Sequence, residues 1–170
     1  MIPTYKSDFR PTMKRWAIIL KAILLITDVL FFIRALVAPS FIDQVVSLLL
    51  GVGVLAIYVY TLNIIPSSIQ LGEKEVIIQR TFGKKSIPYS IIKDAFIYNE
   101  VQGDVRYCGS NGFLGYMGIM GSTLYGKYYS YVKNPQQQVF ILTKNKNYLI
   151  SCENRETFIK ELHTRMVTER

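Results

Sequence analysis

The chain has 170 residues, half of them hydrophobic, and a formal net charge of +8 from 20 basic and 12 acidic side chains. Its apolar residues concentrate between positions 16 and 65, and the roughly 105 residues that follow suffice for one small domain. This distribution predicts a membrane segment plus one domain. The basic flanks of membrane proteins face anionic lipid. We therefore interpret the excess of positive charge as complementary to a lipid surface, and we expect no nucleic-acid partner.

The first 15 residues place four basic side chains and one acid ahead of the apolar segments. A basic flank of this kind is typical of the cytoplasmic side of a membrane. Pro3 and Pro11 argue against one continuous amphipathic helix here. We therefore expect residues 1–15 to form an irregular cytoplasmic tail at the membrane interface.

Residues 16–37 form an apolar segment long enough to span a membrane, although it contains Lys21, Asp28 and Arg34. The two basic side chains lie near opposite ends and can extend towards water, whereas Asp28 cannot. A cleavable signal peptide is the alternative interpretation. The internal charges and Pro39, directly after the only plausible cleavage position, disfavour it.

Residues 45–65 carry no charged side chain and, at ~1.5 Å per residue, extend about 31 Å, close to the ~30 Å hydrocarbon core of a bilayer. They are the stronger of the two predicted spans. The connection 38–44 contains no Lys or Arg, while basic residues flank both outer ends of the pair. The positive-inside rule then places both termini in the cytoplasm, which predicts a multi-pass protein of the inner membrane with a transmembrane hairpin over 16–65.

An acid near the middle of a membrane costs roughly 2.5 to 3.5 kcal/mol and needs a partner. In an antiparallel hairpin Asn63 would lie near the level of Lys21, and Gly51 and Gly53 would let the helices approach each other near Asp28. We interpret Lys21, Asp28 and Asn63 as residues of intramembrane helix contacts. A proton or ion relay would need a second acid, and the two spans contain none.

From residue 66 the hydrophobic period changes from that of a helix to that of a strand. Residues that are β-branched or aromatic predict strands over 75–82, 85–88, 89–99, 128–133, 138–144 and 148–151. Gly83 and Lys84 mark the first turn. The short strands, following one another in chain order, predict an antiparallel meander.

Residues 154–167 predict one amphipathic helix at the end of the chain. Asn154 is a favourable N-cap, and one apolar stripe is formed by Phe158, Ile159, Leu162 and Met166. Together with the strands this predicts an α+β domain over residues 66–170, in which the helix caps the open end of a small, bent antiparallel β-barrel.

Several stretches of this domain resemble the bacterial pleckstrin-homology (PH)-like domains that follow a pair of transmembrane helices in small membrane proteins. The resemblance covers residues 69 to about 166 and is carried by IPYS at 87–90, IIK at 91–93, Arg106, NGFLGYMG at 111–118, the stretches 139–144 and 148–151, and Phe158. It implies a bent, seven-stranded barrel-like sheet at the inner membrane surface. Eukaryotic relatives of the fold bind phosphoinositides through a basic first hairpin, which here would offer Arg80, Lys84 and Lys85.

Glycines at positions 109, 112, 115, 118 and 121 recur with a strict spacing of three. The stretch contains no proline and no phosphate-loop pattern, so neither collagen nor a nucleotide cradle fits it. Two interpretations remain open. The stretch is either a tightly turning connection that lays apolar side chains on the barrel, or a flexible apolar loop that enters the bilayer or binds a partner. For the second we take as candidate contacts Arg106, Phe113, Leu114, Tyr116 and Met117.

Catalytic and metal-binding motifs are missing from the sequence. His163 is the single histidine, and Cys108 and Cys152 lack ligand spacing, so we expect a surface histidine and two reduced, buried thiols. No metal and no cofactor is predicted, and an enzyme is not expected.

The leading hypothesis is a non-enzymatic, membrane-anchored PH-like module that binds a protein partner or anionic lipid at the cytoplasmic membrane surface. The alternative is an accessory or self-associating subunit, in the form of a homo-oligomer or a larger transport or envelope assembly. Basic residues near an anionic surface each contribute about 1 kcal/mol, which supports the leading hypothesis.

Overall fold

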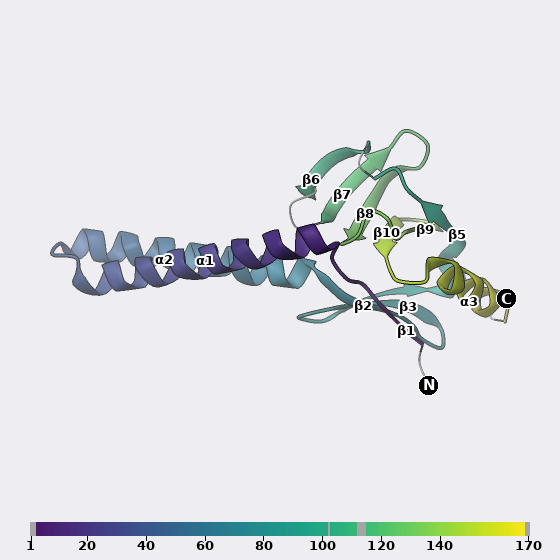
Figure 1. The fold of residues 1–170 in the computed structure, drawn as a ribbon, viewed down its shortest axis with the longest axis horizontal. Coiled ribbons are helices and arrows are strands. Elements are labelled where there is room, and N and C mark those ends of the chain that lie inside the picture. The colour runs from purple at the N-terminus through teal and green to yellow at the C-terminus, as the bar shows by residue number, and fades with distance from the viewer. Residues whose placement is uncertain (1–2, 102, 112–114, 169–170) are drawn as a thin grey trace.

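A computed structural model describes residues 3–101, 103–111 and 115–168. A long helical hairpin projects from one side of a domain built of two β-sheets and a third helix (Figure 1). The helices are α1 (Pro11–Val37), α2 (Phe41–Ile64) and α3 (Arg155–Thr168), with a short 3-10 helix η1 (Tyr89–Ile91). The strands are β1 (Thr4–Lys6), β2 (Pro66–Leu71), β3 (Glu75–Arg80), β4 (Lys84–Pro88), β5 (Ile92–Tyr98), β6 (Val105–Asn111), β7 (Tyr116–Ser122), β8 (Gly126–Val132), β9 (Gln138–Thr143) and β10 (Asn147–Ser151).

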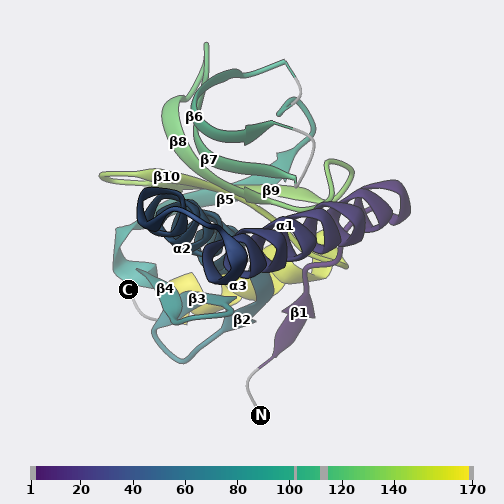
Figure 2. The ribbon, with the colours of Figure 1, turned by 90° about the vertical axis from the view of Figure 1, so that its left-hand side faces the viewer.

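The two long helices run antiparallel and contact each other, and both are long and apolar enough to cross a membrane. Seen along the hairpin, they diverge towards the sheets (Figure 2). Their 27 and 24 residues extend about 40 and 36 Å at ~1.5 Å per residue. The first helix begins at Pro11 rather than at residue 16, because proline is favourable in the first turn, where its missing N–H is not needed. The second begins at Phe41, so the connection between the helices is shorter than the predicted one over 38–44.

The N-terminal segment differs from the irregular tail that the sequence predicts. β1 pairs antiparallel with β2, with Lys6 opposite Ser68, and the Leu71 amide donates to the Pro3 carbonyl at 3.1 Å. In the sequence, the helical hairpin therefore lies between two strands that pair with each other in one sheet. Both helices adjoin the same end of that sheet (Figure 1). Three residues near two prolines are too few to show a strand period, which is why the sequence does not reveal β1.

The strands form two sheets, and these sheets do not close into the barrel that the sequence predicts. The first has the order β1-β2-β3-β4 and the second the order β5-β9-β10-β8-β7-β6. The chain leaves the first sheet after Pro88, where η1 redirects it into β5 of the other sheet, so the two strands beside this turn are not paired. Within the second sheet β8 and β10 run parallel, so the arrangement is not the expected simple meander.

One hydrophobic core lies between the two sheets and α3. Another lies on the opposite face of the second sheet and contains Tyr98, Val101, Met120, Tyr128, Val132, Phe140 and Leu149. Phe158, Leu162 and Met166 are buried and Ile159 is partly buried, as the predicted apolar stripe requires. They pack against buried side chains from both sheets, among them Ile69, Val76, Ile78, Ile87, Val139 and Ile150. The predicted C-terminal helix is thus confirmed, and it covers an open side of a sandwich instead of the end of a barrel.

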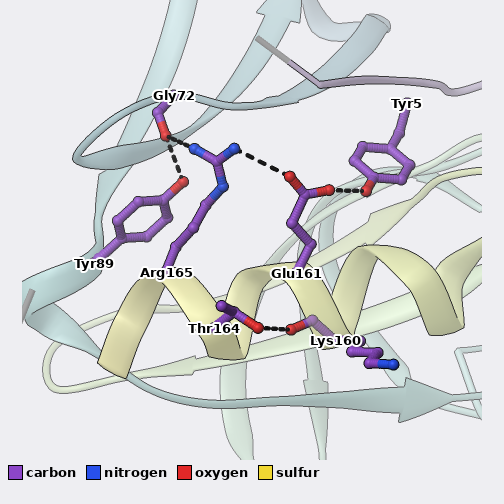
Figure 3. Close-up of polar contacts among 7 residues, drawn as sticks. All are labelled: Tyr5, Gly72, Tyr89, Lys160, Glu161, Thr164 and Arg165. Carbon is purple, nitrogen blue, oxygen red and sulfur yellow. Dashed lines mark hydrogen bonds and ion pairs between the residues drawn. The ribbon is translucent and has the colours of Figure 1, made fainter. Parts of the chain in front are cut away.

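A chain of polar contacts joins α3 to the N-terminal strand and the first sheet (Figure 3). The Tyr5 hydroxyl donates to Glu161 Oε2 at 2.6 Å, and Arg165 Nη2 donates to Glu161 Oε1 at 3.0 Å. Arg165 Nη1 and the Tyr89 hydroxyl both donate to the Gly72 carbonyl at 2.8 Å. The hydrogen bond from Tyr5, aided by Arg165, holds the pKa of Glu161 below its usual range. These contacts fasten both ends of the described chain to the same sheet.

Candidate functional site

The three basic residues of the β3–β4 hairpin do not share one face of the sheet. Side chains alternate along a strand, and the buried Ile78 lies opposite Lys85, so Arg80 and Lys85 point to the inner face. Lys84 points to the outer face, where its Nζ lies 3.9 Å from Glu75 Oε1. An exposed pair of this kind contributes little to stability. The inner pair is therefore the more informative part of the predicted basic site.

On the inner face these basic residues meet tyrosines of the second sheet. Lys85 Nζ lies 6.0 Å from the centre of the Tyr148 ring, which stacks on Tyr129 with 5.9 Å between the ring centres. Burial raises the pKa of Tyr131, while the positive charge of Arg80 opposes this rise. The Tyr131 hydroxyl is consequently protonated at neutral pH and can donate a hydrogen bond.

Arg80 lines a cleft at the place where α2 meets both sheets. This junction cleft has a volume of about 240 Å³ and is lined by Tyr60 and Ile64 of α2, Arg80 of β3, Cys108 and Gly109 of β6, Gly118 and Ile119 of β7, and Tyr129 and Tyr131 of β8. Its lining residues carry a single formal charge, that of Arg80. The cleft is otherwise apolar or aromatic, as ligand sites usually are.

The Arg80 guanidinium is incompletely satisfied in this cleft. Its Nε is buried and has no hydrogen-bond partner among the described residues. Within the same residues, Arg80 also forms no ion pair with an acid. A buried N–H without an acceptor costs about 1–3 kcal/mol, and more when the group is charged. The junction cleft is therefore complementary to an anionic group that accepts hydrogen bonds.

Two glycines of the second sheet line the cleft. Gly109 and Gly118 lie opposite each other in β6 and β7, both with φ of +117°. A Cβ atom on Gly109 would lie 2.0 Å from the Met117 carbonyl oxygen, and one on Gly118 would lie 2.2 Å from that of Cys108. Only glycine permits this approach of the two strands. Two of the regularly spaced glycines thus let the paired strands β6 and β7 approach each other closely. The sequence alone does not reveal this role.

The remaining candidate contacts of the glycine-rich stretch are dispersed. Arg106 is exposed, and its Nη1 donates to the Gly109 carbonyl at 3.3 Å, beside the cleft. Tyr116 is half-buried, while Met117 is only 2% exposed and its side chain is therefore enclosed by the domain. Phe113 and Leu114 lie outside the described residues. The described part of the stretch forms the β6–β7 hairpin rather than a free loop.

The intramembrane candidates lie along the helical hairpin. Asp28 is only 9% exposed, and its Oδ1, like Asn63 Oδ1, is buried without a hydrogen-bond partner among the described residues. Lys21 is half-buried. A Cβ atom on Gly51 would lie 3.4 Å from the Phe32 ring, whereas one on Gly53 would meet no atom within 4 Å. Only the first of the two glycines therefore lies at the helix contact.

The two thiols differ, although the sequence predicts that both are buried. Cys152 is buried and Cys108 is exposed, and both are free. Burial raises the pKa of Cys152 to about 12, with Arg155 opposing the rise. Nε2 of His163 lies 3.1 Å from Asp94 Oδ1 at the surface. In the described ranges, no group of three or more His, Cys, Asp and Glu side chains could hold a metal ion.

Comparison with known proteins identifies the family. A family model described as a bacterial PH domain matches residues 67–166. The chain belongs to the bacterial PH domain family. This confirms the resemblance that the sequence shows, and two helices long and apolar enough to span a membrane precede the PH domain. No match was found among curated proteins or among solved structures.

Domains of this kind are generally binding modules, which agrees with a cleft that offers a cation and tyrosine hydroxyls but no catalytic group arrangement in its lining. Of the predicted site residues that the structure describes, only Arg80 lines the junction cleft. Sequence reasoning missed its tyrosines and its α2 residues. Tyr60 near the end of an apolar span is typical of the aromatic belt at a membrane interface, and this is the one signal that could have pointed to the cleft.

Proposed function

We propose that this protein is a non-enzymatic, membrane-anchored PH-like module that binds anionic lipid at the cytoplasmic surface of the inner membrane. The observation that carries this proposal is the place of the β3–β4 hairpin. Arg80 lies opposite Pro66, and α2 ends at Ile64 just before that proline. The basic hairpin therefore sits at the end of the sheet from which the helical hairpin leaves.

The surface of α1 and α2 supports membrane anchoring. Large apolar side chains cover their outside, among them Leu30, Leu36, Phe41, Ile42 and Leu49. Exposing this much apolar surface to water is unfavourable, whereas a bilayer accommodates it. The basic residues before α1 and after α2 support a cytoplasmic location of the PH domain. A reporter fused after Arg170 should accordingly be active only in its cytoplasmic form, and activity of a periplasmic form would contradict this topology.

The tip of the β3–β4 hairpin combines an apolar and a basic character. Phe82 is 55% exposed, and it lies between Arg80 on one strand and Lys84 and Lys85 on the other. An exposed aromatic ring next to lysines suits the headgroup region, where the ring enters the lipid and each cation adds about 1 kcal/mol. The charge of this tip and its position at the helical hairpin favour lipid over a protein partner. Binding of a protein partner is the other outcome of the test.

The full chain in nanodiscs tests this proposal by hydrogen exchange at the β3–β4 turn. Phosphatidylglycerol nanodiscs should slow exchange relative to phosphatidylcholine nanodiscs, and high salt should remove the difference. The double variant Lys84→Gln/Lys85→Gln should also remove it, whereas Lys74→Gln, an exposed lysine in the β2–β3 turn, should retain it. Equal exchange in the two lipids would contradict lipid binding and point to a protein partner.

A second candidate function is that of a self-associating or accessory subunit in a membrane transport or envelope assembly. The observation that favours it concerns two buried oxygen atoms, Asp28 Oδ1 and Asn63 Oδ1. Neither has a hydrogen-bond partner among the described residues. A polar group from another helix would satisfy such an acid. Asp28→Leu should then change the oligomer or the copurifying proteins in detergent, whereas Asp43→Leu, at an exposed position in the first turn of α2, should not. An unchanged profile for both variants would exclude this function.

A further inference from the structure

We propose that the junction cleft binds the phosphate of one anionic phospholipid, whose acyl chain lies in an apolar groove along α2. This inference rests on the proposed function, because it requires that α2 crosses the membrane. The inference goes further than the proposed function because it assigns a defined site for one lipid molecule per chain. This site is the cleft, and it differs from the exposed surface of the β3–β4 hairpin.

The cation in the cleft selects the charge of the ligand. Arg80 Nε is buried without an acceptor among the described residues, and the cleft lining contains no acid. A guanidinium forms two parallel hydrogen bonds with phosphate oxygens, and Tyr131 lines the same cleft with a hydroxyl that can donate a third. The volume of about 240 Å³ matches a headgroup better than a complete lipid.

An apolar groove continues from the cleft along α2. It is lined by Val52, Leu55, Ala56, Val59, Tyr60 and Asn63, and therefore shares Tyr60 with the junction cleft. From residue 52 to residue 63 the helix rises about 16 Å, so the groove can hold much of an extended acyl chain. An anion site at one end of an apolar groove is the pattern that an amphipathic lipid requires.

The length of α2 places the cleft at the level of the headgroups. Its 24 residues extend about 36 Å, while the hydrocarbon core is ~30 Å thick, so about one turn lies outside the core. With the excess at the end of α2 next to the PH domain, that turn covers residues 61–64. Ile64 lies in it and Tyr60 directly precedes it, and both line the cleft. A phosphate bound at Arg80 would therefore leave its acyl chain in the membrane and would not need to extract the lipid.

Cys108 provides a probe of occupancy in the natural protein. It is exposed and lines the cleft, whereas Cys152 is buried. In the full chain in detergent, dioleoyl phosphatidylglycerol should slow alkylation of Cys108, while dioleoyl phosphatidylcholine and inorganic phosphate should have little effect. Native mass spectrometry should show one phosphatidylglycerol retained per chain. Equal protection by inorganic phosphate would overturn the lipid assignment, and equal protection by phosphatidylcholine would overturn the role of charge.

Two variants separate the headgroup from the acyl chain. Arg80→Gln should weaken the apparent affinity for phosphatidylglycerol about tenfold or more, as expected for loss of a charged hydrogen-bond donor. Ala56→Trp should fill the groove and also abolish Cys108 protection. The matched controls are Lys74→Gln, at an exposed lysine in the β2–β3 turn, and Ala22→Trp, on the exposed surface of α1. Unchanged lipid retention in both test variants, with melting temperatures like that of the parent protein, would overturn the inference.

The double variant Lys84→Gln/Lys85→Gln distinguishes this site from the proposed surface binding. It should lose the lipid-dependent hydrogen exchange of the β3–β4 turn and keep Cys108 protection. If phosphatidylglycerol slows exchange at the turn but does not protect Cys108 in the parent protein, the cleft inference fails and the proposed function stands. If neither effect is observed, both fail.

Discussion

Tyr5 and Ile69 lie opposite each other in β1 and β2, although the entire helical hairpin separates them in the sequence. The Tyr5 ring packs edge-on against Phe158 of α3 with 5.1 Å between the ring centres. A residue that precedes the first helix therefore belongs to the core of the domain that follows the second helix. The chain segments before and after the helical hairpin pair with each other as β1 and β2, and this pairing, rather than a linker, sets the orientation of the domain relative to the hairpin.

Substitution of Tyr5 should separate its two contributions to stability. Tyr5→Phe removes the hydrogen bond to Glu161 and should lower the free energy of unfolding by about 1–2 kcal/mol. Tyr5→Ala also removes the contact with Phe158 and should cost about 2 kcal/mol more. Denaturant unfolding in mild detergent measures both. Tyr107→Phe, at an exposed tyrosine of β6, is the control and should change stability by less than about 0.5 kcal/mol.

Gly118 should be intolerant of even the smallest side chain. In Gly118→Ala the new methyl group would meet the Cys108 carbonyl oxygen, and the φ of +117° would be strained. We expect a loss of more than about 1 kcal/mol and distortion of the β6–β7 pairing, visible as faster hydrogen exchange in these strands. The matched substitution Gly103→Ala meets no atom closer than 3.6 Å and should be tolerated. Equal stability of both variants would contradict the close approach of β6 and β7 at this glycine.

Lys133 should make stability depend on pH. It is only 7% exposed, and its Nζ donates to the Ser7 carbonyl at 2.5 Å. Burial lowers its pKa to about 8, with Asp8 raising it and Lys21 lowering it further. Between pH 8 and about 10 the unfolded chain binds this proton more tightly than the folded chain, so stability rises with pH in that window. Below pH 8 both states are protonated, and this contribution is constant.

Thermal unfolding at pH 7, 8, 9 and 9.5 measures this rise. Lys133→Met should reduce it, whereas Lys127→Met, at an exposed lysine, should retain it. Burial also raises the pKa of Cys152, Tyr98 and Tyr128, so the unfolded chain loses these protons before the folded chain does and stability then falls as the pH rises. The thiol opposes the rise from about pH 9, equally in both lysine variants, and the range ends below pH 10 to avoid the tyrosines. A rise of the same size in both lysine variants would show that another group is responsible.

The two cysteines should react at very different rates. Cys108 is exposed, while Cys152 is buried and its pKa is raised to about 12, so little of its thiolate forms at pH 8. Alkylation of the folded protein at pH 8, followed by peptide mass spectrometry, should modify Cys108 and leave Cys152 unmodified. After unfolding in denaturant both should react. Modification of Cys152 in the folded protein would indicate that the core around α3 opens.

The sequence by itself identified the elements whose patterns are local. The uncharged stretch 45–65, the apolar stripe on α3 and the strand periods after residue 66 each depend on neighbouring residues, and the structure contains a helix or strand at each of these places. The family could also be named from such stretches. Local periodicity suffices there because one face of each element is buried.

Tertiary structure alone decided how these elements combine. β1 is too short to show a period, and only its pairing with β2 defines it. The strand register, not the cluster of charges, directs Arg80 to the inside and Lys84 to the outside. The junction cleft collects residues from α2, β3, β6, β7 and β8, which lie far apart in the sequence. Contacts between distant segments depend on register and packing of the whole domain, and neither leaves a repeating pattern within a single segment.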